Sequence, residues 1–285
     1  MKMRLEPLDG EAPGSDRPAR PVAAFGAGTV IGALGGLIGL GGAEFRLPLL
    51  IGAFRFAALE AVILNKAMSL VVVASALPFR AQTVPFAAIA AHWTILVNLL
   101  CGSLLGAWLG AGWATRLRTE KLYAVIAVLL VLIAGVLLVG HGPEAGGHAV
   151  IGGGVRVVTG IAAGFAIGVV ASLLGVAGGE LLIPTLVVLF GVDIKLAGSL
   201  SLAISLPTML VGFTRYSRDR SFAVLRHNRL FVIVMAAGST VGSFVGGRLL
   251  GIVPSTVLLP ALVAILLVSA AKVWRHRSTD RPSRT

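Results

Sequence analysis

The stretch "GLIGLGGAEFRLPLL" (residues 36–50) interrupts one of the most apolar segments of the chain. Its glycines are Gly39, Gly41 and Gly42, and they are followed by Glu44, Arg46 and Pro48. Glycine lets the backbone turn and lets another group approach closely, whereas proline lacks an N–H. The pattern predicts that one helix ends at the glycines and that a new helix starts there, with Pro48 in its first turn.

The remainder of the 285-residue chain has the composition of a membrane protein. Hydrophobic residues make up 56% and charged residues 13%, whereas soluble domains carry about 25% charged residues. Runs that approach or exceed the ~20 residues needed to cross a bilayer occupy residues 22–43, 85–111, 121–140, 155–179 and 229–247. The runs are continuous and do not alternate, so we predict an all-α polytopic integral membrane protein and not a β-barrel.

Charge and cysteine content exclude several classes. The net charge is +12 and lies in the tails and connections, which favours orientation in a lipid bilayer over nucleic-acid binding. The single cysteine, Cys101, excludes an intrachain disulfide and a cysteine metal cluster. The sequence has no Walker A motif for ATP, and we expect neither a metal nor a cofactor.

The glycine-rich motif occurs twice. "GLGGAEFRLP" (39–48) recurs as "GVAGGELLIP" (175–184), 136 residues later. The same offset pairs Glu44 with Glu180 and Pro48 with Pro184. It also pairs two glycine strips of four-residue spacing, Gly102, Gly106 and Gly110 with Gly238, Gly242 and Gly246. We predict two transmembrane repeats, residues 22–140 and 155–275, joined by a connecting loop at 141–154. Residues 1–21 and 276–285 form the N-terminal and C-terminal tails.

Loop charges indicate that the repeats are inverted. Loop 215–229 carries five arginines and its partner 79–93 carries one. Loop 112–121 carries three basic residues and its partner 248–257 carries one. The positive-inside rule then places equivalent loops on opposite sides. Inversion needs an odd number of crossings, which follows if residues 22–54 enter, turn at the glycines and return as a broken or re-entrant helix. Both termini would be cytoplasmic, in a multi-pass protein of the inner membrane.

Paired helix starts favour a site for an anion. Helix N-termini carry free N–H groups and about half a positive charge. The candidate substrate-binding residues are Gly39, Gly41, Gly42, Glu44, Asn65, Lys66 and Ser69 in the first repeat, and Gly175, Gly178, Gly179, Glu180, Ser201 and Ser205 in the second. Pro48 and Pro184 mark the helix breaks.

Several roles stay open for the polar residues. Each glutamate could interact with its own helix N-terminus, carry a proton coupled to substrate, or pair with Lys66 or Arg46. Lys66 lies inside an apolar run, where it could face a partner or cavity, or extend to the interface. Asn65 and Ser69 share a helix face and could line a substrate path or bond between helices.

The sequence resembles the TauE/SafE sulfite exporter family, a group of bacterial permeases. The resemblance rests on the repeated motif, on "ALEAVILNKAMSLVVV" (58–73) and on "GVAGGELLIPTLVVLFGVDIKLAGSLSLAISLPT" (175–208). The first motif departs at Ala43 and Arg46, where the family more often has glycine and an apolar residue. The resemblance implies a secondary transporter of sulfite, thiosulfate or a small organosulfonate, with export favoured. H+ is the expected coupling ion, since a glutamate inside the membrane can carry a proton.

Other functions and assemblies compete with this expectation. They are an anion channel, an uptake permease for a non-sulfur anion, a membrane-embedded enzyme and a non-transporting accessory protein. An enzyme is disfavoured because the five histidines are scattered and no H-E-x-x-H motif occurs. The expected partners are a small anion and the lipid bilayer. The glycine strips could pack within one protomer or between the protomers of a homo-oligomer.

Overall fold

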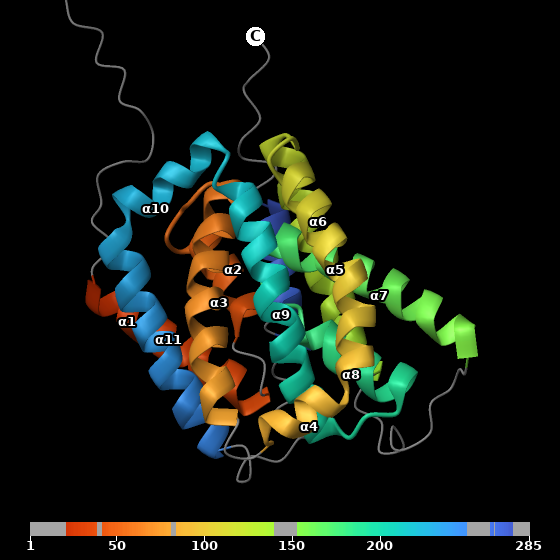
Figure 1. Ribbon diagram of the computed structural model, residues 1–285. Coiled ribbons are helices and arrows are strands. Elements are labelled where there is room, and N and C mark those ends of the chain that lie inside the picture. The colour runs from red at the N-terminus through yellow and green to blue at the C-terminus, as the bar shows by residue number, and fades with distance from the viewer. Residues whose placement is uncertain are drawn as a thin grey trace, which may run out of the picture.

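The computed structural model describes residues 21–38, 42–80, 84–139, 153–249, 263–264 and 266–275. All the elements within these ranges are helical (Figure 1). In chain order they are α1 (Pro21–Ile38), α2 (Ala43–Gly52), α3 (Ala58–Arg80), α4 (Phe86–Ala91), α5 (Trp93–Ala114), α6 (Thr119–Val139), α7 (Gly153–Leu174), α8 (Gly179–Phe190), α9 (Ile194–Tyr216), the 3-10 turn η1 (Arg220–Ala223), α10 (Val224–His227) and α11 (Arg229–Leu249). Residues 263–264 and 266–275 are also helical.

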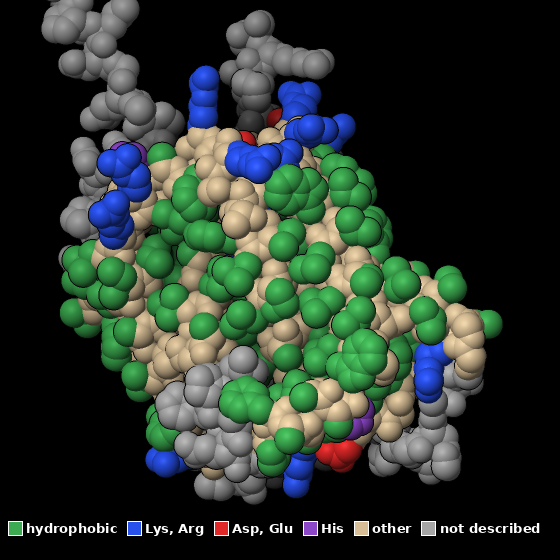
Figure 2. Space-filling model, in the orientation of Figure 1, with side chains coloured by type: hydrophobic (Ala, Val, Ile, Leu, Met, Phe, Trp, Pro, Cys, Tyr) green, Lys and Arg blue, Asp and Glu red, His purple; other side chains and the backbone are tan. Residues whose placement is uncertain are grey.

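The surface of this helical bundle is that of a membrane protein. Five of the described helices, α3, α5, α7, α9 and α11, are long and apolar enough to cross a bilayer. Large apolar side chains such as Leu105 and Ile233 point outward. Figure 2 shows hydrophobic side chains over the middle of one face, with most of its Lys and Arg side chains at the upper end and a few at the lower end. A soluble monomer rarely exposes so much contiguous apolar surface, so we conclude that the chain is a multi-pass membrane protein.

Two helix pairs join the repeats, and each pair has one helix from either repeat. Helix α1 packs along α11, and α7 packs along α5. A Cβ added at Gly32 of α1 would lie 2.8 Å from the Cα of Ser239. The position equivalent to Gly32 in α7 is Gly168, and a Cβ there would lie 2.9 Å from the carbonyl carbon of Ser103. Since the 136-residue offset relates these two contacts, the internal repeat of the sequence is also a repeat of packing.

The glycine strips have the predicted structural role. A Cβ at Gly102, Gly106 or Gly110 would collide with the backbone of α7, and a Cβ at Gly238, Gly242 or Gly246 with that of α1. Small residues let helix backbones approach closely, which is how helices associate in lipid. The strips therefore join the two repeats within one chain.

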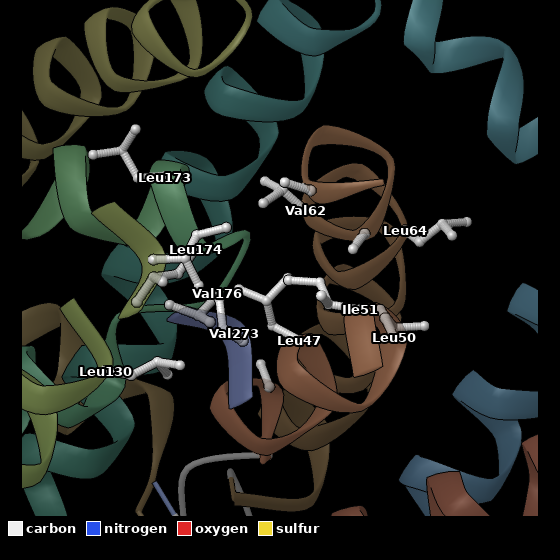
Figure 3. Close-up of a cluster of buried hydrophobic side chains, with 14 of the residues drawn as sticks. Leu47, Leu50, Ile51, Val62, Leu64, Leu130, Leu173, Leu174, Val176 and Val273 are labelled. Atoms are coloured by element: carbon white, nitrogen blue, oxygen red, sulfur yellow. The ribbon is translucent and has the colours of Figure 1, made fainter. Parts of the chain in front are cut away.

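The main core lies where the first repeat meets the end of α7. Figure 3 shows side chains of this core from α2, α3, α6, the α7–α8 connection and the helical residues near the C-terminus. Leu47 and Leu50 of α2 have no exposed surface, and Val176 is 1% exposed. A short helix of ten residues such as α2 has few internal hydrogen bonds and depends on such packing. The core therefore fixes the position of the first motif.

Connections that are equivalent in the two repeats lie at opposite ends of the bundle. Helix α4 lies at the bottom of Figure 1 and its counterpart, η1 with α10, lies at the top. The connections rich in basic residues, 112–121 and 215–229, both lie at the upper end (Figure 1). Arg215 and Arg218 of the second connection lie 5.3 and 5.1 Å from the ring of Trp108, near the end of α5, where the first connection begins. One predicted run is wrong in detail, since residues 85–111 are divided at His92 into α4 and α5.

Candidate functional site

Both glycine-rich motifs break a helix, as predicted. Helix α1 ends at Ile38 and α2 starts at Ala43, while α7 ends at Leu174 and α8 starts at Gly179. Positive φ angles occur at Gly42 (70°), Gly175 (66°) and Gly178 (81°), a conformation that side chains with a Cβ disfavour. Gly39 and Gly41 lie outside the described residues. At 1.5 Å per residue α2 is about 15 Å long, roughly half the ~30 Å hydrocarbon thickness.

The prolines do not lie in the first helical turn, and that expectation was wrong. Pro48 is the sixth residue of α2 and Pro184 the sixth of α8. The helices begin earlier because Gly42 and Gly178 end the turns and act as N-caps. A proline cannot donate to the carbonyl four residues before it. The residues whose carbonyls lose this donor are Glu44 and Glu180.

The two glutamates occupy equivalent positions at the helix breaks. Each is the second residue of its short helix, and each is buried, with 2% of Glu44 and 3% of Glu180 exposed. The carboxyl group of Glu44 in the first repeat and that of Glu180 in the second are close enough to interact electrostatically. Both oxygens of Glu180 and Oε1 of Glu44 are buried without a hydrogen-bond partner. The helix N-termini stabilise negative charge here, and three carboxyl oxygens remain available to a proton or a ligand.

Arg46 is the largest fully buried side chain near the breaks, and the sequence-based list of site residues omitted it. It lies in α2 with 0% of its surface exposed. Its Nη1 donates to Oδ1 of Asn65 at 3.4 Å and to Oγ of Ser69 at 3.2 Å. Nε and Nη2 have no partner, and Glu44 is an electrostatic neighbour. Asn65 and Ser69 share a face of α3, as predicted, and this face binds the guanidinium group of Arg46.

Asn65 joins the two helix breaks directly. From α3, its Nδ2 donates to the carbonyl of Ala43, the first residue of α2, at 3.0 Å. It also donates to the carbonyl of Leu174, the last residue of α7, at 3.1 Å. Buried polar groups must find partners, and this one amide satisfies groups of both repeats. The predicted line of polar residues on α3 thus lies at the junction of the motifs.

Lys66 is buried among helices and does not extend to the interface, so that alternative is wrong. Its side chain is 0% exposed. Nζ donates to the carbonyl of Ala171 at 3.4 Å and to Oγ of Ser172 at 3.3 Å, just before the second break. Gly212 of α9 leaves the room, because a Cβ there would lie 2.9 Å from Nζ. The amino group is therefore held inside the bundle, with neutral oxygens as acceptors.

The second repeat contributes fewer polar contacts than predicted. Ser205 donates to the carbonyl of Ala177, inside the second break, at 2.7 Å. Ser201 instead donates to the Gly198 carbonyl of its own helix. Ser172, which was not predicted, also donates to the Ala107 carbonyl at 3.0 Å. Its counterpart 136 residues earlier is a glycine, so comparison of the two repeats could not identify Ser172 as a site residue.

Comparison of the sequence with models of known protein families identifies the family of this chain. The model of the sulfite exporter TauE/SafE family matches residues 23–273. The chain belongs to the TauE/SafE family. Searches of curated proteins and of solved structures gave no match. As a TauE/SafE protein it is a membrane transporter of the sulfite exporter type, and both motifs that carried the resemblance form the helix breaks described above.

Four ionisable side chains lie buried around the helix breaks of this TauE/SafE protein. They are two basic side chains, Arg46 and Lys66, and two carboxyl groups, Glu44 and Glu180. Ionisable residues at such depth are costly and mark substrate or proton pathways. In the described part of the chain, no group of three His, Cys, Asp or Glu residues is placed to hold a metal ion. The chemistry on offer is ion binding and proton exchange.

Proposed function

We propose that this protein is a secondary transporter that carries a small sulfur-containing anion, such as sulfite or an organosulfonate, out across the inner membrane. The observation that carries the proposal is the set of buried ionisable residues at the paired helix breaks. Broken backbone at membrane depth is tolerated where it lines a cavity or is buried in protein. In secondary transporters such breaks form the substrate and coupling-ion sites.

Two inverted repeats would supply the alternating access. The exchange of α1 and α7 between repeats, and the position of α4 and α10 at opposite ends, support this arrangement. We therefore place both termini and the arginine-rich connections in the cytoplasm, with residues 1–21 and 276–285 as tails and 141–154 on the outer side.

Cysteine labelling tests the inversion with a matched pair of sites. Ala87 and Ala223 are exposed, occupy equivalent positions of the two repeats, and flank the membrane at α4 and η1. In a background in which Cys101 is replaced by serine, Ala223→Cys should react with an impermeant maleimide from the cytoplasmic side. Ala87→Cys should react from the outer side. Labelling of both from one side would show that the repeats are parallel.

The paired carboxyl groups would couple anion movement to protons. With both glutamates ionised, Glu44 and Glu180 balance the charges of Arg46 and Lys66. With both protonated, the same cluster carries two uncompensated positive charges, which attract a dianion. Protons and anion would then cross in the same direction, so export would be driven by the outward concentration gradient of the anion. Because an unbalanced charge is expensive in a low-dielectric interior, proton and anion occupancy of the site would depend on each other.

Flux of radiolabelled sulfite into proteoliposomes tests the proposed function. Purified protein should give saturable uptake that responds to an imposed pH gradient, well above that of protein-free liposomes. Uptake that does not saturate and ignores the gradient would indicate a channel. Absence of flux for sulfite, thiosulfate and methanesulfonate would refute transport of a sulfur anion.

A further inference from the structure

Arg46 distinguishes the first repeat from the second. The equivalent position in α8 is Leu182, 136 residues later. Both are buried, with 0% of Arg46 and 2% of Leu182 exposed. An arginine that merely fills core volume could be a leucine, as it is in the second repeat. Its presence in an environment that is costly for a charge points to a ligand.

The hydrogen bonds of Arg46 leave one whole edge of the guanidinium free. Nη1 is held by Asn65 and Ser69. Nε and Nη2 are the two buried nitrogens without a partner. In the planar guanidinium these two N–H groups point in the same direction and form the edge that binds two oxygens of one anion. A free edge of this kind leaves a desolvation penalty that a bound oxyanion removes.

Asn65 and Ser69 orient this edge. Both lie on one face of α3 and accept from Nη1 at 3.4 and 3.2 Å, so the plane of the guanidinium is set by a helix that packs against α2. Asn65 is itself fixed by two backbone carbonyls, one from each helix break. The guanidinium is therefore preorganised between the two breaks, and not free to rotate as an exposed arginine would be.

We propose that the Nε–Nη2 edge of Arg46 binds the transported anion by a two-point contact with two oxygens on one central atom. This inference rests on the proposed function and narrows its substrate class to oxyanions such as sulfite and sulfonates. A spherical anion such as chloride offers one acceptor atom, so it cannot give each N–H group an oxygen of its own as a sulfite or sulfonate group does. Glu44 is a charged neighbour of the guanidinium, so the anion would compete with its carboxylate for the same edge.

Direct binding to the purified protein tests this assignment. Binding of radiolabelled sulfite in lipid nanodiscs would be compared for wild type, Arg46→Leu and Arg46→Lys, with competition by a small sulfonate and by chloride. Arg46→Leu restores the residue of the second repeat, and Arg46→Lys keeps the charge but loses the paired N–H groups. Arg118→Leu, which removes an exposed arginine outside the cluster, is the control for loss of one charge.

The expected result is a graded loss of affinity. Arg46→Leu should weaken sulfite binding about 100-fold and Arg46→Lys about tenfold, since charge-assisted hydrogen bonds contribute strongly. Arg118→Leu should bind as wild type does, and the sulfonate but not chloride should compete. If Arg46→Leu fails to fold, Arg46→Lys decides.

Two results overturn the assignment and are distinguishable. In the first, the wild type binds sulfite and Arg46→Leu binds it with the same affinity. If Arg46→Leu does not fold, the same result with Arg46→Lys counts. This outcome would overturn the assignment and leave the proposed function intact. It would show that Arg46 only balances the charge of Glu44. Failure of the wild type to bind sulfite, thiosulfate or methanesulfonate would refute the proposed function, and the assignment to Arg46 with it.

Discussion

Gly32→Ala is expected to separate α1 from α11 and so weaken the joint between the repeats. The new methyl carbon would lie 2.8 Å from the Cα of Ser239 and closer still to its carbonyl oxygen, whereas ordinary contacts begin at 3.4 Å. Because the obstacle is backbone, the helices must move apart by roughly 0.6 Å or more, which forfeits dispersion along the contact. Overpacking costs about 1–3 kcal/mol, and replacing a helical glycine returns about 0.5–1 kcal/mol. The free energy of unfolding should fall by about 1–2 kcal/mol.

Unfolding by SDS in mixed micelles, followed by tryptophan fluorescence, measures this change. Gly26→Ala on the same helix is the control, because a Cβ there meets nothing within 4 Å. It should leave stability unchanged or raise it by up to about 1 kcal/mol. Gly168→Ala makes the equivalent collision with Ser103 and should resemble Gly32→Ala. Equal stability of Gly32→Ala and Gly26→Ala would refute the close packing of α1 and α11.

Three further substitutions separate stability from transport. Lys66→Met should fold at least as well as wild type, because an apolar side chain of similar length replaces a buried charge, yet lower sulfite flux at least about tenfold; wild-type flux would show that the ammonium is not used. Gly212→Ala should shift the end of the Lys66 side chain, which lies 2.8–2.9 Å from the new Cβ, and reduce flux with under about 1 kcal/mol lost in SDS unfolding. Asn65→Ala removes two hydrogen bonds between the breaks and should cost about 1–3 kcal/mol in the same assay, and a smaller cost than that would contradict the role of this amide as a joint.

Much of the architecture was predictable because it depends on local rules. Glycine is needed where φ is positive, as at Gly42 and Gly178, and this fixes both helix breaks from the sequence. The four-residue spacing of the glycine strips fixes which helix face packs closely. The prolines were misplaced because proline is common in a first turn, whereas here its effect falls on the carbonyls of Glu44 and Glu180.

The site was only partly predictable, since its contacts join distant segments. Arg46 follows Glu44 by two residues, which on a helix places them about 200° apart. A regular helix therefore disfavours a direct pair, which the sequence left open, and Arg46 bonds to Asn65 and Ser69. The spacing of those two residues predicted a shared face but not what lies opposite. That identity depends on how α2 packs on α3, which the tertiary core decides.

The response of sulfite flux to a pH gradient in the Glu44→Gln, Glu180→Gln double variant tests the central claim most directly. Glutamine keeps the shape and the hydrogen-bonding capacity of a protonated carboxyl group but cannot release a proton. In proteoliposomes, wild-type flux should change with the imposed gradient, and flux through the double variant should be independent of it, whatever its absolute rate. An undiminished gradient response in the double variant would show that these carboxyl groups do not couple anion transport to protons.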